Sequence, residues 1–261
     1  MIFAKKSLGQ NFLIDKNIIR KITNLVQIKD KNIIEIGPGL GALTDEILKK
    51  KPKLIYLIEK DKILSQELEV KYSSNKNIKI YNNDILDFDL EKILKKNSII
   101  FGNLPYNISS QILVKILRFK KWPPLFDNLI FMFQKELGEK ILGEQKENHY
   151  GRLSILTKYR LQILSKFLVS KNCFSPRPKI TSIVILFRPR KKQAPFIKNI
   201  LNLEKITNIF FSNKRKMINK KIKRILNKYE IESIKELKLN SRPSELKPEI
   251  YYKITELFEK K

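Results

Sequence analysis

One tetrapeptide of this 261-residue chain, Asn103-Leu104-Pro105-Tyr106, combines residue types that can act together on an exocyclic amine. The side-chain carbonyl of Asn103 and the backbone carbonyl that precedes Pro105 can accept the two hydrogens of such an amine. Those bonds would draw the nitrogen toward a tetrahedral geometry and free its lone pair for attack. Tyr106 can stack on a base that has been flipped out of its helix. This chemistry needs neither a metal nor a general base, because the product ammonium loses its proton readily.

Glycines and carboxylates upstream of the tetrapeptide stand where a nucleoside could bind. Glycine lets the backbone turn sharply and approach a ligand closely, and Gly37, Gly39 and Ala42 satisfy the relaxed dinucleotide fingerprint. Glu59 can accept hydrogen bonds from ribose hydroxyls, and Asp84 can accept one from the amine of an adenine. Nicotinamide dinucleotides and S-adenosylmethionine both use a carboxylate on the ribose. Asp84 and the tetrapeptide favour S-adenosylmethionine.

The elements that would position these residues are short apolar runs separated by helical patterns. Near-continuous apolar strands that alternate with helices are typical of a parallel sheet covered on both faces. Open α/β sheets bind ligands at the carboxyl ends of their strands, which is where the polar residues stand. Strands are predicted at residues 33–37, 54–59, 78–82 and 98–102, and helices around residues 43–48, 63–70 and 112–117.

The pattern changes after residue 125. Residues 128–134 indicate a fifth strand, and residues 135–142 indicate its helix. Residues 162–170 and 181–188 look like two strands joined by a proline-rich turn, which predicts an antiparallel edge of the sheet.

A polar segment broken by prolines follows Arg188, and we place a domain boundary there. Residues 1–190 are the predicted catalytic domain, and residues 191–261 are a predicted basic, all-α domain. Apolar residues at helical spacings run from Ile206 to Leu226. A last helix is predicted from Pro248 through Leu257, with proline in its first turn.

The charge of the chain is strongly unbalanced. It has 54 lysines and arginines against 26 aspartates and glutamates, a net charge of +28. Such an excess indicates a polyanionic partner, most simply nucleic acid, and Lys220, Lys221 and Arg224 are candidates for contacting an RNA backbone. An AT-rich coding sequence also enriches Lys, Asn and Ile, so compositional bias stays open as a second explanation.

Other compositional features exclude several classes of protein. The single cysteine, Cys173, excludes an internal disulfide framework and a Cys-cluster zinc site, and we expect it to be a small buried hydrophobe. His149 lies in a polar stretch and is predicted to be a solvated loop residue. No apolar run reaches the roughly 18 residues of a membrane span, and the start does not resemble a signal peptide. These features predict a soluble cytoplasmic protein without a metal.

Taken in order, the motifs resemble those of the bacterial 16S rRNA adenine dimethyltransferases, the dimethyladenosine transferase family. The resemblance covers most of residues 6–188 in the family's order and spacing. It implies a Rossmann-like class I S-adenosylmethionine-dependent methyltransferase, with a mostly parallel sheet, an antiparallel edge and a small all-α C-terminal domain. The matching segments are residues 6–13, 35–41, 103–109, 134–136, 150–154 and 174–179.

The resemblance also implies roles for individual residues. Asn11 and Leu13 would close over the cofactor from the N-terminal segment. The S-adenosylmethionine site would be lined by Gly37, Glu59, Asp84 and Asn103. The target adenine would be held by Asn103, Leu104, Tyr106 and, as a second aromatic wall, Phe174. The implied reaction is four methyl transfers, two to each of two adjacent adenines near the 3′ end of small-subunit rRNA. The expected substrate is a pre-30S particle, and the expected oligomeric state is a monomer.

Four alternatives stay open at this point. A large-subunit rRNA methyltransferase of the macrolide-resistance type shares the fold and motifs, although residues 9–13 and 150–154 favour the small-subunit type. A DNA adenine methyltransferase is disfavoured because no separate base-reading domain is visible. An RNA-binding factor on an inactive methyltransferase fold is disfavoured by the intact tetrapeptide. A nicotinamide dehydrogenase lacks residues for hydride transfer.

Overall fold

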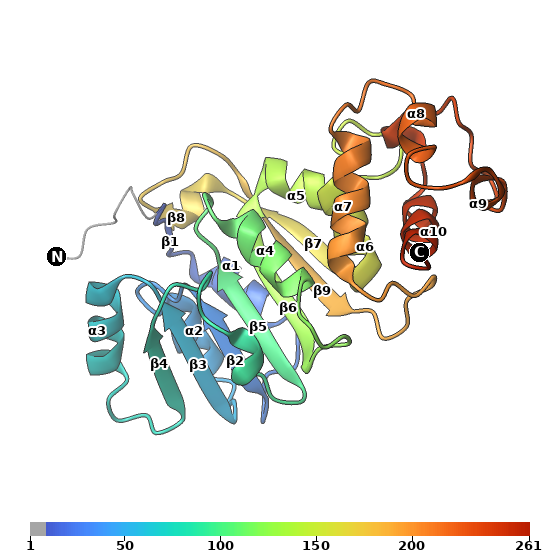
Figure 1. Ribbon diagram of the computed structural model, residues 1–261. Coiled ribbons are helices and arrows are strands. Elements are labelled where there is room, and N and C mark those ends of the chain that lie inside the picture. Colours follow the sequence, from blue (N-terminus) through green and yellow to red (C-terminus); the bar gives the residue numbers. More distant parts are fainter. Residues whose placement is uncertain (1–8) are drawn as a thin grey trace. The chain divides into compact units, whose positions relative to one another are not determined.

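The computed structural model describes residues 9–261, so Lys6, Ser7 and Leu8 of the predicted N-terminal motif lie outside the described residues. The chain divides into two compact units, shown in Figure 1. Among the described residues, unit 1 contains residues 9–135 and 163–189, and unit 2 contains residues 136–162 and 190–261. Within residues 9–261, every helix is too short or too polar to cross a membrane.

Unit 1 is built on a sheet whose strand order is β4-β3-β2-β5-β6-β9-β7 in the described part of the chain. The pairs from β4 to β6 are parallel, whereas β9 runs antiparallel to β6. The mostly parallel sheet with an antiparallel edge is therefore confirmed. The strands are β2 (Asn32–Ile36), β3 (Leu54–Glu59), β4 (Ile78–Asn82), β5 (Ser98–Asn103), β6 (Phe126–Gln134), β7 (Leu161–Val169) and β9 (Ser182–Pro189).

Helices cover both faces of this sheet, because alternate residues of the strands point to opposite sides. One face carries Ile33, Leu57 and Phe101, which share a buried cluster with residues of α1, α2 and α3. The opposite face is covered by α4, which crosses in front of β5 in Figure 1. The helices are α1 (Lys16–Thr23), α2 (Ala42–Leu48), α3 (Lys62–Lys71) and α4 (Ser109–Leu117).

A second, two-stranded sheet closes the N-terminal segment onto a distant part of unit 1. Strand β1 (Phe12–Leu13) pairs antiparallel with β8 (Phe174–Ser175), and Leu13 lies opposite Phe174. The N-terminus of α1 follows directly, where the Asp15 side chain accepts hydrogen bonds from the amides of Asn17 and Ile18. This arrangement fixes residues 11–13 next to the carboxyl ends of the parallel strands.

Apart from the first two residues of β7, unit 2 consists of helices and turns within the described residues. Two of its helices, α5 and α6, come from the segment that the sequence assigned to the first 190 residues. The reason is packing: the Tyr252 hydroxyl donates to the carbonyl of Ile155, and the Tyr159 and Tyr252 rings lie 4.8 Å apart. The helices are α5 (Lys135–Leu142), α6 (Arg152–Arg160), α7 (Ile200–Phe211), α8 (Asn219–Ile222), α9 (Lys228–Glu232) and α10 (Pro248–Phe258).

The basic stretch at residues 214–227, where apolar residues at helical spacings predicted helix, is helical only in part. Only α8, with four residues, is helical there, and turns flank it on both sides. Ile218 and Ile222 are buried, but Met217 is 53% exposed. Lys221, within α8, donates a hydrogen bond from its ammonium group to the carbonyl of Phe210 near the end of α7.

Candidate active site

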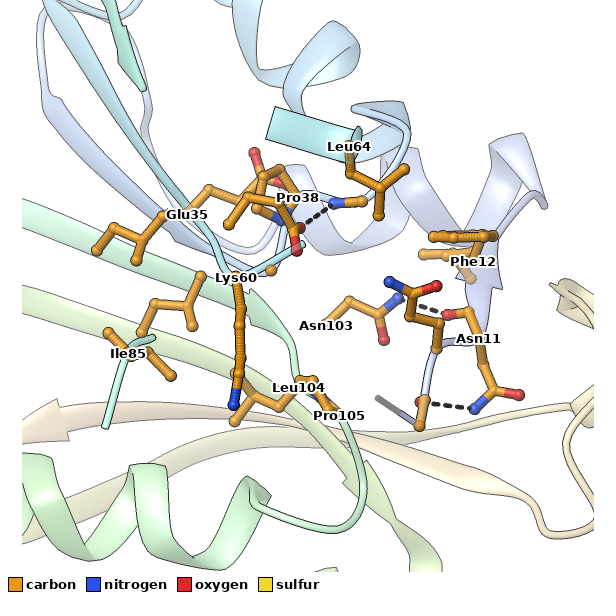
Figure 2. A pocket seen from close by; sticks show the side chains of 18 of the residues that line it. Asn11, Phe12, Glu35, Pro38, Lys60, Leu64, Ile85, Asn103, Leu104 and Pro105 are labelled. Atoms are coloured by element: carbon orange, nitrogen blue, oxygen red, sulfur yellow. Dashed lines mark hydrogen bonds between the residues drawn. The ribbon is translucent and has the colours of Figure 1, made fainter. Parts of the chain in front are cut away.

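Eight of the nine predicted site residues line one cavity of about 370 Å³ at the carboxyl ends of the parallel strands. Figure 2 shows Asn11, Asn103 and Leu104 around this cavity, with Lys60 extending between Ile85 and Leu104. The volume lies in the range of small-molecule sites, roughly 300–1,000 Å³. The eight residues are Asn11, Leu13, Gly37, Glu59, Asp84, Asn103, Leu104 and Tyr106.

The turn after β2 requires glycine at two of its positions for different reasons. Gly37 has a φ of 68°, in the left-handed region that favours glycine. Gly39 has a φ of 58°, and a β-carbon added there would lie 2.9 Å from the Phe12 ring. The Phe12 ring of the N-terminal segment thus lies directly against the turn, and a side chain at position 39 would displace it.

Glu59, at the end of β3, is 6% exposed and already holds the backbone around it. Its Oε2 accepts from the amide of Gly39 at 3.1 Å, and its Oε1 accepts from the amide of Asp61 at 2.9 Å. Burial raises the pKa of Glu59, and the two amide hydrogen bonds only partly offset it. Each carboxylate oxygen retains acceptor capacity, so this side chain can also receive the hydroxyls of a ribose.

Asp84, which follows β4, faces a lysine that the sequence analysis did not assign to the site. Its Oδ2 accepts from Lys60 Nζ at 2.6 Å, and its Oδ1 accepts from the amide of Leu86 at 2.9 Å. Partial burial raises the pKa of Asp84, but the hydrogen bonds from Lys60 and Leu86 outweigh it, and the net pKa lies below the ordinary value. The group is therefore an ionised acceptor at neutral pH.

Asn103 ends β5 and is held by the N-terminal segment. Its Nδ2 donates to the backbone carbonyl of Asn11 at 3.1 Å, and the Asn11 side chain donates to the carbonyl of Gly9 at 3.1 Å. Because the nitrogen of the Asn103 amide is engaged, its oxygen is the atom left to accept a hydrogen bond from a ligand. This is the orientation that an amine acceptor needs.

Tyr106 is half-buried at the wall of the cavity. Its hydroxyl lies 2.6 Å from the hydroxyl of Ser182, the first residue of β9, and its backbone carbonyl accepts from Ser109 Oγ at 3.2 Å. Burial raises the pKa of Tyr106, and the Ser182 hydrogen bond lowers it by less. The phenol therefore stays protonated at neutral pH.

Phe174, the predicted second aromatic wall, does not line the cavity. It is 3% exposed and belongs to the same buried cluster as Leu13, with which it pairs between β8 and β1. Strand pairing places the ring in the core beneath the N-terminal segment. Phe174 reaches this cavity only through Leu13, with which it pairs, and its role as a second aromatic wall for the target adenine stays a prediction.

Glu35, in β2, lines the cavity and was missed by the sequence analysis. It is 2% exposed, and Thr44 Oγ1 donates to its Oε2 at 2.7 Å. Burial raises the pKa of Glu35 to about 7, despite the Thr44 hydrogen bond. The signal in the sequence was a carboxylate inside an otherwise apolar strand, two residues before the Gly37 turn.

Cys173 and His149 were predicted to lie outside the site, the first buried and the second solvated, and the structure agrees. Cys173 is 8% exposed, and the His149 side chain is 44% exposed with Nε2 at 3.7 Å from Glu139. Across residues 9–261, no three His, Cys, Asp or Glu side chains are grouped as metal ligands would be.

Similar proteins indicate the family of this chain. The family model described as ribosomal RNA adenine dimethylase matches residues 2–260 of the chain. A ribosomal RNA small subunit methyltransferase A from Pelagibacter ubique (strain HTCC1062) is 45% identical over 260 residues, which is 98% of this chain and 97% of that protein.

Two solved structures share the fold over most of the chain. A dimethyladenosine transferase from Plasmodium falciparum has a TM-score of 0.80 and 25% identity, covering 95% of this chain and 98% of that one. The 23S rRNA methyltransferase ErmE has a TM-score of 0.73 at 22% identity, covering 95% of this chain and 100% of that one, and supports the fold alone. The chain belongs to the ribosomal RNA adenine dimethylase family.

Proposed function

We propose that this chain transfers methyl groups from S-adenosylmethionine to the N6 amines of two adjacent adenines near the 3′ end of small-subunit rRNA. The observation that carries the proposal is the Asn103 amide, whose nitrogen is bonded to the Asn11 carbonyl so that its oxygen remains as an acceptor at the cavity. The name of the Pelagibacter relative, a small subunit methyltransferase, supports the choice of rRNA.

The cavity fits S-adenosylmethionine in both shape and donor set. Gly39 lets the Phe12 ring lie against the turn, where a β-carbon would meet it, and both residues line the cavity. Glu59 would hold the ribose and Asp84 the adenine amine, while Asn11 and Leu13 border the same cavity from the N-terminal segment. When bound, S-adenosylmethionine supplies an electrophilic methyl group.

The residues of β5 and the following loop would prepare the target amine. Asn103 Oδ1 and the backbone carbonyl of Leu104 would each accept one amine hydrogen, which concentrates the nitrogen lone pair on the side away from them. The Tyr106 ring would stack on the flipped base, an interaction of roughly 1–3 kcal/mol. No side chain needs to remove a proton before transfer, because the methylated ammonium is acidic enough to lose it to water.

The C-terminal unit would supply affinity for the rRNA backbone. Lys220, Lys223 and Arg224 are exposed, and no carboxylate is paired with them in the described part of the chain. Lys221, which the sequence grouped with them, is instead half-buried against Phe210 and Ser212. Free cations of this kind bind phosphates and release counterions.

We further infer that the substrate is a pre-30S particle, that the enzyme works as a monomer, and that it acts in the cytoplasm. The predicted division of labour also belongs to this proposal, with catalysis in residues 1–190 and rRNA contact in residues 191–261. The grouping of residues 136–162 with residues 190–261 in unit 2 supports an RNA-binding unit that would include residues 136–162.

The test is mass mapping of modified adenines in small-subunit rRNA from cells that lack the protein, carry it, or carry Asn103→Ala. We expect two adjacent dimethyladenines only with the wild-type chain. A separate single-turnover assay on unmodified particles tests the mechanism, and a near-normal rate for Asn103→Ala would refute the role of Asn103 as an amine acceptor. Modification in large-subunit rRNA instead would move the proposal to the macrolide-resistance type, and binding without modification would favour an RNA-binding factor.

A further inference from the structure

Tyr106 is tethered at both ends, and the two tethers come from different parts of unit 1. At the backbone, its carbonyl accepts from Ser109 Oγ at the start of α4. At the tip of the ring, its hydroxyl lies 2.6 Å from Ser182 Oγ, although the two residues are 76 positions apart in the chain. Because the backbone of Tyr106 is held by Ser109, the ring cannot change its χ1 rotamer without breaking the hydrogen bond between its hydroxyl and Ser182.

Ser182 is well placed to act as a fixed anchor. It is completely buried, and its backbone is in register with Gln134 as β9 pairs with β6. The preceding residue, Thr181, accepts a backbone hydrogen bond from Lys135 at 3.0 Å. The anchor is therefore part of the central sheet, whereas Tyr106 lies in a loop that depends on such contacts for its position.

We infer that Ser182 is a positioning residue for methyl transfer, because its hydroxyl holds the Tyr106 ring in the orientation that receives the target adenine. This inference rests on the proposed role of Tyr106 as the stacking partner of the base. Ser182 itself does not line the cavity. Its effect on the reaction must pass entirely through the tyrosine hydroxyl, and this requirement can be measured.

The experiment is a double-mutant cycle of Ser182→Ala and Tyr106→Phe, read out as single-turnover methylation of small-subunit particles from cells that lack the protein. Each change removes one partner of the same hydrogen bond. We expect each variant, and also the double variant, to be slower by the same factor of about three to ten, the range that one net hydrogen bond supports. Saturating particle concentrations separate this effect from binding.

Three controls distinguish positioning from a general structural role. Ser175→Ala removes an exposed hydroxyl from β8, the strand that precedes β9 in the chain, and should leave the rate unchanged. Affinity for S-adenosylmethionine, measured by calorimetry, should be the same in all variants. Fluorine NMR of protein labelled with 3-fluorotyrosine should show one sharp Tyr106 resonance, identified by its loss in Tyr106→Phe, which shifts or broadens in Ser182→Ala.

The outcomes separate this inference from the proposed function. A further rate loss when Ser182→Ala is added to Tyr106→Phe would show that the serine acts through another group and would overturn the inference. Wild-type rates in both single variants, with a slow Tyr106→Ala, would overturn it while leaving the stacking role intact. A wild-type rate in Tyr106→Ala would overturn both the inference about Ser182 and the stacking role of Tyr106. If the wild-type chain left the particles unmodified, the proposed function would fail, and an unchanged Tyr106 resonance in Ser182→Ala would overturn the anchor as well.

Discussion

Replacing Glu35 by glutamine should remove a loss of folding stability that wild-type unit 1 suffers as the pH rises. Glu35 is 2% exposed in β2, and the Thr44 hydroxyl donates a hydrogen bond to its carboxylate at 2.7 Å. Burial raises its pKa from the ordinary value of 4.5 to about 7, and the nearby carboxylates of Asp45 and Glu59 add to the rise. Glutamine keeps the shape and an oxygen acceptor for Thr44 but has no ionised form.

The sign and size of the effect follow from this pKa. In the folded protein Glu35 keeps its proton up to about pH 7, whereas in the unfolded chain it ionises near pH 4.5. The unfolded state therefore binds fewer protons between these values, and stability falls as the pH rises through this window. At about 1.4 kcal/mol per pH unit, the wild-type protein loses about 3 kcal/mol between pH 4.5 and pH 7, and no more above it.

Urea denaturation of wild type and Glu35→Gln at pH 5, 6, 7 and 8 measures this directly. The variant should gain stability relative to wild type as the pH rises, and the gain should level off above pH 7. Glu136→Gln is the control, because the pKa of this exposed carboxylate is lowered by its hydrogen bond from Lys140, so the change has the opposite sign. A stability difference between Glu35→Gln and wild type that is independent of pH would refute the reasoning.

Three further predictions concern ligand binding. Asp84→Ala should weaken S-adenosylmethionine binding by about 1–3 kcal/mol, since an adenine amine would lose its acceptor; unchanged affinity in calorimetry would remove Asp84 from the site. Gly39→Ala should disturb Phe12, whose ring is 2.9 Å from the added carbon, and weaken cofactor affinity more than it lowers the melting temperature; normal affinity would contradict this fit. Glutamine at Lys220, Lys223 and Arg224 should flatten the salt dependence of particle binding by about 0.7–0.9 per lost phosphate contact. A wild-type slope would assign these charges to compositional bias.

The central strands β2, β3 and β5 could be predicted from the sequence because they are buried along nearly their whole length. Such strands appear as continuous apolar runs, and β3 begins and ends where the sequence placed it, as does the more exposed strand β4. The polar residue that follows each run must then lie at the ligand-binding edge. Glu59, Asp84 and Asn103 meet at one cavity for this reason.

Other features depend on contacts between distant residues, which local patterns do not encode. The sequence could not show that Phe174 would be buried beneath Leu13, because this follows from the pairing of β1 with β8. The Lys60–Asp84 and Tyr106–Ser182 bonds likewise join different strands or loops. In the basic stretch, a helical spacing of Ile218, Ile222 and Ile225 was also compatible with successive turns, which is the observed structure.

The pairing of β1 with β8 has a consequence for the order in which the site is completed during synthesis. Glu35, Glu59, Asp84 and Asn103 come from one continuous stretch of chain, but β1 has no strand partner among the described residues other than β8. The ribosome makes Asn11 early and Phe174 late. Strand β1, next to the residue that orients Asn103, can therefore pair only after most of unit 1 has been synthesised. Pairing between segments so far apart in the chain is slow compared with local pairing. A nascent or truncated chain that ends before residue 174 would carry the acidic side chains of the pocket without the rim that holds the amide in place.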